Sequence, residues 1–135
     1  MQLQPYLFFD GRAEEAIEFY RSKLGATVGM VMRFKDCPEP QQQPPGSANK
    51  IMHAELRIGD TAVLASDGRC QGQPNFQGFA LSLTATEDAE ANRLFSSLSE
   101  GGQVQMPLGK TFFASSFGMV TDRFGVSWMV YVPRQ

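Results

Sequence analysis

The residues best suited to chemistry lie in one stretch of the chain, Lys50–Asp67. Its two strand-like runs meet at Gly59-Asp60, and glycine followed by a polar residue is typical of a two-residue type II′ hairpin turn. This turn pairs His53 on one strand with Ser66 on the other, and alternation along the strand puts Glu55 on the same face. The only histidine of the chain therefore shares a strand face with a carboxylate and a hydroxyl.

These side chains support two interpretations. In the first, His53 is a proton shuttle or a hydrogen-bond donor to a ligand, because imidazole titrates near neutral pH, and Glu55 orients it or acts as the base. In the second, they are polar residues of a half-exposed strand that simply meet water. One histidine and one glutamate fall short of the three protein ligands of a catalytic metal site. Asp67 either joins this group or caps the loop that follows.

The opposite face of the same hairpin is apolar and predicts a core, with Met52, Ala54, Leu56, Ile58, Val63 and Ala65. The composition agrees with a core of some size, because 42% of the 135 residues are apolar and 11 are Phe. A net charge of −2 leaves no broad basic surface for nucleic acid. No apolar run approaches the roughly 20 residues that span a bilayer, and Met1–Phe9 has no basic leader. We expect a cytoplasmic protein without nucleic-acid or membrane partners.

The two cysteines, Cys37 and Cys70, lie in polar, loop-like surroundings and match no zinc or redox spacing. In a reducing compartment two free thiols are expected, and a disulfide between them is the alternative.

The first half of the chain predicts a strand, a helix and three strands. The strand is Leu3–Phe9, and Asp10 is expected to cap the helix that follows. Apolar residues at helical spacing then run up to Gly25, where glycine ends the helix. The second strand is Ala26–Lys35, and a loop with four prolines, Asp36–Asn49, leads to the hairpin.

The second half repeats this pattern. A strand at Phe76–Leu83 precedes a helix capped by Thr84 or Thr86, with an apolar stripe that ends near Gly101-Gly102. Three strand candidates follow, at Gln103–Leu108, Phe112–Thr121 and Val126–Val132. The sequence therefore predicts one α+β domain over 1–135, built from βαβββ modules at 1–67 and 76–135 with a linker at 68–75. A helix covers one sheet face of such a module, so the bare face must be covered by the other module or by a second chain.

Short motifs in this order resemble the vicinal oxygen chelate superfamily, which includes glyoxalase I, bleomycin-resistance proteins and extradiol dioxygenases, and within it the PhnB-like group. The motifs are Tyr6-Leu7-Phe8-Phe9-Asp10-Gly11, Glu15-Ala16-Ile17-Glu18-Phe19-Tyr20, Leu24-Gly25-Ala26, His53-Ala54-Glu55-Leu56, Ser66-Asp67, Gly101-Gly102 and Asp122-Arg123-Phe124-Gly125-Val126-Ser127-Trp128. The resemblance implies curved mixed sheets with helices on the outer faces, a cavity inside each sheet, and a homodimer.

The metal enzymes of the superfamily carry His and Glu ligands at positions that correspond here to Pro5, Leu64, Gly78 and Met129. None of these side chains is a His, carboxylate or thiolate ligand, so we expect no metal and no cofactor. Some PhnB-like proteins carry a demethylubiquinone methyltransferase label, but this chain has no glycine-rich methyl-donor loop.

The resemblance places Leu64 in the cavity, and His53, Glu55 and Ser66 on the same face with it. From the second module it adds Gly78, Met129 and Tyr131 as ligand-binding residues, although these could equally fill the core. We therefore expect a protein that binds a small, partly apolar molecule without a metal. The alternative is an enzyme of lyase, isomerase or dioxygenase type, either metal-free through His53 and Glu55 or with a metal at a non-standard site. A structural or partner-binding module is a third possibility.

Overall fold

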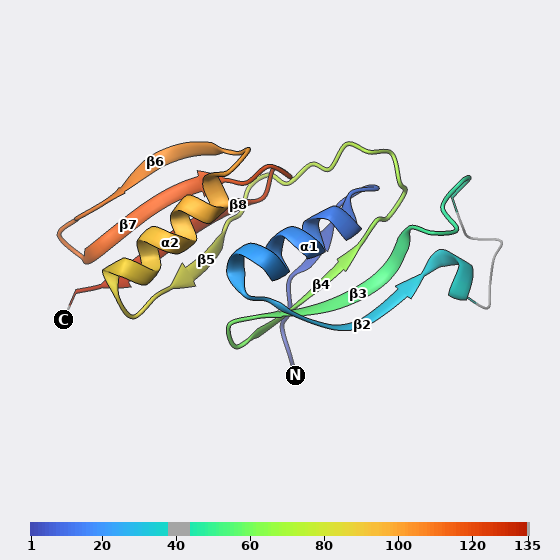
Figure 1. The fold of residues 1–135 in the computed structure, drawn as a ribbon, viewed down its shortest axis with the longest axis horizontal. Coiled ribbons are helices and arrows are strands. Elements are labelled where there is room, and N and C mark those ends of the chain that lie inside the picture. Colours follow the sequence, from blue (N-terminus) through green and yellow to red (C-terminus); the bar gives the residue numbers. More distant parts are fainter. Residues whose placement is uncertain (38–43, 135) are drawn as a thin grey trace. The chain divides into compact units, whose positions relative to one another are not determined.

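The structure of the protein is a computed structural model that describes residues 1–37 and 44–134. The chain separates into two compact units, Met1–Pro74 and Asn75–Gln135. Each unit contains one four-stranded mixed sheet and one α-helix (Figure 1). Residues 38–43 of the expected proline-rich loop lie outside the described residues.

The first unit has a strand, a helix and three strands in sequence order. These elements are β1 (Tyr6–Phe8), α1 (Ala13–Leu24), β2 (Thr27–Arg33), β3 (Ile51–Ile58) and β4 (Thr61–Ser66), with a short 3-10 helix η1 (Phe34–Asp36) after β2. The strand order in the sheet is β1-β4-β3-β2. β1 runs parallel to β4, and the other pairs are antiparallel.

The second unit repeats this arrangement. Its elements are β5 (Leu81–Thr84), α2 (Asp88–Ser99), β6 (Gln103–Gly109), β7 (Ala114–Thr121) and β8 (Ser127–Pro133). The strand order is β5-β8-β7-β6, and β5 runs parallel to β8. The expected α+β fold of two βαβββ modules is confirmed. Of the helices in the described part of the chain, neither has the length and apolar character needed to cross a membrane.

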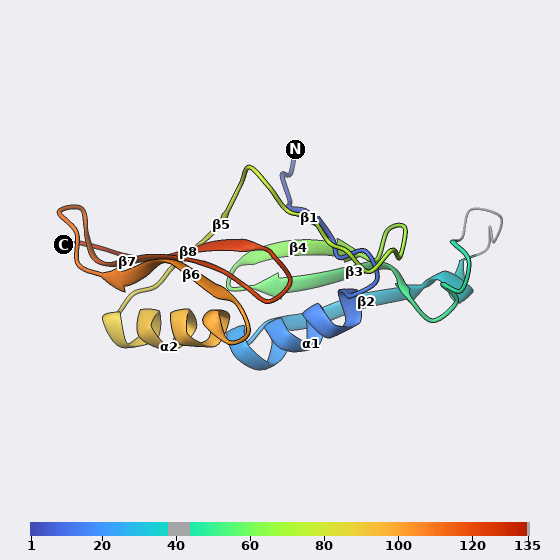
Figure 2. The same ribbon diagram turned by 90° about the horizontal axis from the view of Figure 1, so that it is seen from above.

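Each sheet has one face covered by the helix of its own unit, as Figure 2 shows from above. In the first unit the sheet residues of this core are the buried side chains of Leu7, Ala54, Leu56, Val63 and Ala65. In the second unit α2 contributes the predicted stripe of Ala91, Leu94, Phe95 and Leu98, all buried. We call the opposite face of each sheet, which its own helix does not cover, the open face.

The hairpin turn between β3 and β4 is as the sequence predicts. Glu55 pairs with Leu64 and Ile58 with Thr61, which leaves Gly59 and Asp60 as the two turn residues. Gly59 has a φ of 59°, the positive value that a type II′ turn requires at its first corner. The register therefore divides the hairpin into an apolar face against α1 and a more polar open face.

The expected helix caps were wrong. Asp10 does not cap α1: it has a positive φ of 52°, and its carboxylate accepts a hydrogen bond from the backbone N–H of Gln71. Thr84 and Thr86 do not cap α2, which has Glu87 at the cap position without a side-chain cap bond. Instead, Glu90 in the first turn accepts a hydrogen bond from the backbone N–H of Thr86.

Two first strands are shorter than expected. β1 starts at Tyr6 rather than Leu3, and β5 starts at Leu81 rather than Phe76. Before β5, Gly78 has a φ of 82°, which is incompatible with extended strand conformation. The helix end at Gly25 is confirmed, since this residue adopts the left-handed conformation with a φ of 70°.

Candidate functional site

The open face of the first unit combines exposed aromatic rings with the single histidine. Tyr6 on β1 lies beside Leu64 on β4, and Leu64 lies beside Glu55 on β3, so the three share this face. His53 belongs to the same face, because it is two residues from Glu55. The ring of Tyr6 is 38% exposed and that of Phe8 is 55% exposed, so both lie at the surface of the unit.

A hydrogen bond joins the tyrosine to the histidine. The Tyr6 hydroxyl lies 2.8 Å from Nδ1 of His53, and the two ring centroids are 5.6 Å apart. Tyr6 also stacks on Phe8, with centroids 4.9 Å apart and planes inclined by 23°. Burial raises the pKa of the Tyr6 hydroxyl above its ordinary value, and a hydrogen bond from Ser66 opposes that rise. Tyr6 therefore stays protonated at neutral pH and has a proton to donate.

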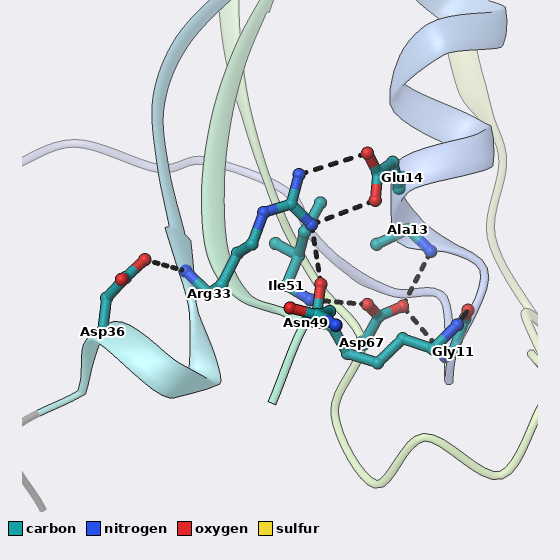
Figure 3. A network of polar contacts seen from close by, with 9 residues as sticks. Gly11, Ala13, Glu14, Arg33, Asp36, Asn49, Ile51 and Asp67 are labelled. Atoms are coloured by element: carbon teal, nitrogen blue, oxygen red, sulfur yellow. Dashed lines mark hydrogen bonds and ion pairs between the residues drawn. The ribbon is translucent and has the colours of Figure 1, made fainter. Parts of the chain in front are cut away.

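Asp67 directly follows Ser66, the last residue of β4, and its carboxylate lies beside the start of α1 (Figure 3). Its side chain is only 1% exposed. Oδ1 accepts hydrogen bonds from the backbone N–H groups of Gly11 at 3.0 Å and Ala13 at 2.7 Å, and Oδ2 accepts one from Ile51 at 2.7 Å. The carboxylate thus satisfies N–H groups at the start of α1 and stabilises its positive end. Asp67 performs the capping that the sequence assigned to Asp10.

A second contact fastens β2 to α1 behind the open face. Both Nη atoms of Arg33 donate to the carboxylate of Glu14, at 3.0 Å and 3.1 Å, and Nη1 also donates to the carbonyl of Asn49 at 2.6 Å. The hydrogen bond from Arg33 is the main cause that lowers the pKa of Glu14. Figure 3 shows Arg33 and Asp67 in one network of polar contacts at the start of α1. These contacts connect the start of α1 to β2 and to the start of β3.

The open face of the second unit is built mainly from apolar rings and methionines. Phe117 lies beside Tyr131, and Met119 lies beside Met129, in the pairing of β7 with β8. The ring of Phe113 lies 5.3 Å from that of Phe117 and 6.2 Å from that of Tyr131. This face therefore offers an aromatic surface without a histidine.

An open hollow of about 520 Å³ lies at the start of α2. Its lining includes Thr86, Glu87, Asp88, Lys110, Ser115, Val132, Pro133 and Arg134. Asp88 accepts hydrogen bonds from the hydroxyls of Ser116 at 2.6 Å and Ser115 at 2.8 Å. These two bonds, with a smaller effect of Lys110, lower the pKa of Asp88. The carboxylate that faces the hollow is thus already engaged by its own unit.

Comparison with known proteins identifies the family. The family described as 3-demethylubiquinone-9 3-methyltransferase matches residues 1–131. Protein YjdN of Escherichia coli K12 is 36% identical over 143 residues, which cover all of this chain and 97% of YjdN. The chain belongs to this PhnB-like family. A crystal structure of protein PA1353 from Pseudomonas aeruginosa is 46% identical, with a TM-score of 0.87 and coverage of 100% of this chain and 99% of that one.

Other solved structures agree with the PhnB-like assignment. A PhnB protein from Bacillus cereus is 26% identical, with a TM-score of 0.82, and covers 98% of this chain and 99% of its own. A glyoxylase/bleomycin resistance protein/dioxygenase domain from Frankia sp. EAN1pec is 13% identical with a TM-score of 0.63, covering 100% of this chain and 93% of that domain. The second likeness shows that the two proteins share a fold.

The positions that correspond to metal ligands in the wider superfamily do not fit a metal in this PhnB-like chain. The backbone N–H of Leu64 donates to the carbonyl of Pro5 at 2.9 Å, so these two residues are neighbours, but neither side chain carries a donor atom for a metal. Met129 lies beside Ser82 rather than Gly78, which lies outside β5. Among residues 1–37 and 44–134 no three His, Cys, Asp or Glu side chains are grouped to hold a metal ion.

The structure brings some of the expected site residues together and separates others. His53, Glu55 and Leu64 are half-buried on one open face. Ser66 is buried at the edge of that face and contacts the hydroxyl of Tyr6. Met129 and Tyr131 are half-buried on β8 in the second unit.

Tyr6 and Phe8 are the residues that the sequence reasoning missed. Their signal was available, because they flank the buried Leu7 in strict alternation. What the sequence spacing did not provide was the parallel pairing of β1 with β4, which places Tyr6 against the hairpin residues. Both cysteines, Cys37 and Cys70, are free thiols in the structure.

Proposed function

We propose that this PhnB-like protein binds a small, partly apolar molecule on the open face of the first unit, and that it does so without a metal. The rings of Tyr6 and Phe8 supply the apolar contact area, and His53 with Glu55 supplies the polar contacts. Small-molecule sites commonly consist of apolar and aromatic walls with a few placed polar groups.

The observation that carries this proposal is the Tyr6–His53 hydrogen bond on a face with exposed rings. If His53 only contacted solvent, it would need no side-chain partner. Instead it is hydrogen-bonded to Tyr6, whose ring is itself stacked on Phe8. The hydrogen bond restricts rotation of the His53 side chain before a ligand binds, and such preorganisation favours binding. Ser66 and Leu64 belong to the proposal as further ligand contacts on this face. Gly78, Met129 and Tyr131, which the resemblance also assigned to ligand binding, lie in the second unit.

A thermal-shift screen of the full chain against a broad panel of small molecules tests this function. A ligand present at 100 times its Kd stabilises the folded state by about 2.7 kcal/mol, which raises the melting temperature measurably. We expect one chemical class to give this shift and Phe8→Ala to remove it, whereas Phe112→Ala, at a ring that is 91% exposed in the second unit, leaves it unchanged. A panel without any hit would contradict the proposal.

An enzyme of the same superfamily is the second candidate. It is favoured by the same Tyr6–His53 contact, because a hydroxyl, an imidazole and a nearby carboxylate are the groups of acid–base catalysis. Elemental analysis of the purified protein tests for a metal at a non-standard site, and a stoichiometric transition metal would overturn the metal-free proposal. An activity that His53→Ala abolishes would establish the enzyme, and one that survives this change would remove His53 from catalysis.

Methyl transfer, which the family description names, is a third possibility for this chain. It requires a bound methyl donor, and the sequence has no glycine-rich loop of the kind that binds one. Calorimetry with S-adenosylmethionine is the direct test, and we expect no binding. We further propose that the protein is a cytoplasmic homodimer.

A further inference from the structure

The open face of the first unit carries a carboxylate that has no partner within its own chain segment. Glu55 is half-buried, and among residues 1–37 and 44–134 its side chain makes neither a hydrogen bond nor an ion pair. The next residue of this face on β3 is Arg57, whose Nη1 donates to the carbonyl of Asp60 at the turn, at 3.1 Å. The guanidinium is thus engaged at the turn, and Glu55 leaves a local negative charge on the face.

Aromatic rings extend toward this carboxylate from the other edge of the sheet. Tyr6, Leu64 and Glu55 are successive neighbours across β1, β4 and β3. Neighbouring strands are about 4.8 Å apart, so the backbones of Tyr6 and Glu55 are separated by about 10 Å. The side chain of Tyr6 crosses much of this distance, because its hydroxyl lies 2.8 Å from Nδ1 of His53 on β3. An aromatic surface and a carboxylate therefore lie within the span of one small molecule.

The second ring of this surface is the more exposed one. Phe8 stacks on Tyr6 and is 55% exposed. Its Cδ1 lies against Gly68, where an added Cβ atom would come within 3.3 Å, so the absence of a side chain at residue 68 leaves room for the ring. The face of an aromatic ring is electronegative and attracts cations. The rings and the carboxylate therefore favour the same sign of charge in a ligand.

We propose that the open face of the first unit binds a small organic cation, with an alkylated, positively charged nitrogen between Glu55 and the rings of Tyr6 and Phe8. This inference names the ligand class of the proposed function and rests on it. Aromatic rings are the usual contacts of quaternary ammonium groups in proteins. Glu55 would repel an anionic group on the same molecule, so zwitterions such as S-adenosylmethionine fall outside this class.

Three probes of similar size test the sign of the charge: phenyltrimethylammonium, a cation; tert-butylbenzene, in which carbon replaces the charged nitrogen; and tert-butylbenzoate, an anion. Ligand-observed NMR titrations of the full chain at about pH 8, where an ordinary imidazole is uncharged, give their affinities. The first two probes have the same shape, so the difference between them reports charge rather than apolar contact. We expect the cation to bind at least about threefold more tightly than tert-butylbenzene, from a cation–π contact at an exposed ring and a surface charge pair. The anion should bind more weakly than both.

Two variants separate the carboxylate from the rings. Glu55→Gln keeps the shape of the side chain and should weaken binding of the cation about two- to fivefold, with tert-butylbenzene unchanged. Phe8→Leu keeps an apolar side chain but removes the aromatic face, and it should also reduce the preference for the cation about two- to fivefold. Glu87→Gln is the matched control, because it removes an exposed carboxylate from the second unit and should leave all three affinities unchanged.

The outcomes separate this inference from the function on which it rests. Equal affinities of the cation and tert-butylbenzene for the wild type overturn the ligand class while the proposed function stands. A preference that survives in both Glu55→Gln and Phe8→Leu, or one that Glu87→Gln reduces equally, also overturns it, as does failure of all three probes. The proposed function itself fails only when the broad thermal-shift panel gives no hit either.

Discussion

Asp67 shows how a single buried carboxylate can organise a unit of this size. Three backbone N–H groups from α1, the segment before it and β3 converge on its two oxygens. The preceding residue, Ser66, points to the other face and contacts Tyr6. Alternation at the end of β4 therefore directs Ser66 to the open face and Asp67 into the core.

Asp67→Ala is expected to destabilise the protein strongly. It leaves three N–H groups without an acceptor in a buried region, and each unsatisfied group costs about 1–3 kcal/mol. We expect a loss of at least about 3 kcal/mol in the free energy of unfolding, measured by urea denaturation. Asp67→Asn should cost about 1–3 kcal/mol, because the amide keeps one acceptor oxygen but turns an NH₂ group toward Ile51.

Asp60→Asn is the matched control for this pair. Asp60 is exposed at the turn between β3 and β4, and its contact with Arg57 uses the backbone carbonyl, which the substitution keeps. A change within about 0.5 kcal/mol is expected for such a surface site. If the Asp67 variants unfolded at the same urea concentration as the control, the capping role of this carboxylate would be wrong.

At the scale of elements, the contact between α2 and its sheet depends on a glycine in β7. A Cβ atom at Gly118 would lie 2.8 Å from Cε2 of Phe95 on α2 and 3.0 Å from the backbone of Leu108 on β6. Both distances are shorter than van der Waals contact. The helix can pack this closely on the sheet only because residue 118 has no side chain.

Gly118→Ala is therefore expected to destabilise the second unit by about 1–3 kcal/mol, the usual cost of an added methyl group in a packed core. Gly109→Ala in β6 is the control, because the nearest atom to its added Cβ is 3.9 Å away. Chemical denaturation of both variants measures the difference. Equal midpoints would mean that α2 can move away from the sheet at no cost.

Hydrogen bonds to the ionised carboxylate of Asp88 stabilise the start of α2, and we therefore predict that the stability of the fold depends on pH. Hydrogen bonds from Ser116 and Ser115 lower the pKa of Asp88, so its ionised form is favoured in the folded state. The resulting stability is present above the ordinary pKa of an aspartate, near 3.9, and is lost as the pH falls through the lowered pKa of the folded state. The double variant Ser115→Ala/Ser116→Ala should show a smaller loss of stability between about pH 5 and 2.

This prediction is checked by unfolding the wild type and the variant across the same pH range. Thr111→Ser, which keeps a hydroxyl on the loop before β7, is the control and should retain the wild-type slope. Parallel pH profiles of the wild type and the double variant would show that the hydroxyls do not favour the ionised Asp88.

Periodicity in the sequence was enough to predict most elements, because each has a pattern that depends on few neighbours. The stripe at Leu94, Phe95 and Leu98 predicted a helix face, and Gly59 predicted the turn and hence the register of β3 with β4. The caps were wrong for a physical reason: Asp67, which caps α1, is 54 residues from the bonded N–H of Ala13. No local pattern can indicate a cap that comes from another strand.

The candidate site was predictable to a similar degree. His53, Glu55 and Leu64 followed from alternation within one hairpin. Tyr6 did not, because its approach to His53 depends on the parallel pairing of β1 with β4, which brings together residues 47 positions apart. Gly78 was aligned as a strand position, but its positive φ places it before β5.

At the scale of the whole molecule, the two units repeat one topology and differ in chemistry. In both, the first strand runs parallel to the last, with Tyr6 beside Leu64 and Ser82 beside Met129. The first unit has the histidine and its hydrogen-bonded tyrosine on the open face, while the second has rings and methionines. The repeat thus preserves the covered face of each sheet and varies the open one.

The open faces lead to the last prediction, which concerns the oligomeric state. Met106 at 45% and Phe113 at 42% exposure are large apolar side chains, and burying such surface contributes roughly 25 cal/mol per Å². Under the proposed homodimer, sedimentation equilibrium should give twice the mass of the chain. The melting temperature should also rise by about 2–4 °C for each tenfold increase in concentration, because mass action favours the associated folded state. The mass of one chain at all concentrations, with a constant melting temperature, would contradict the homodimer.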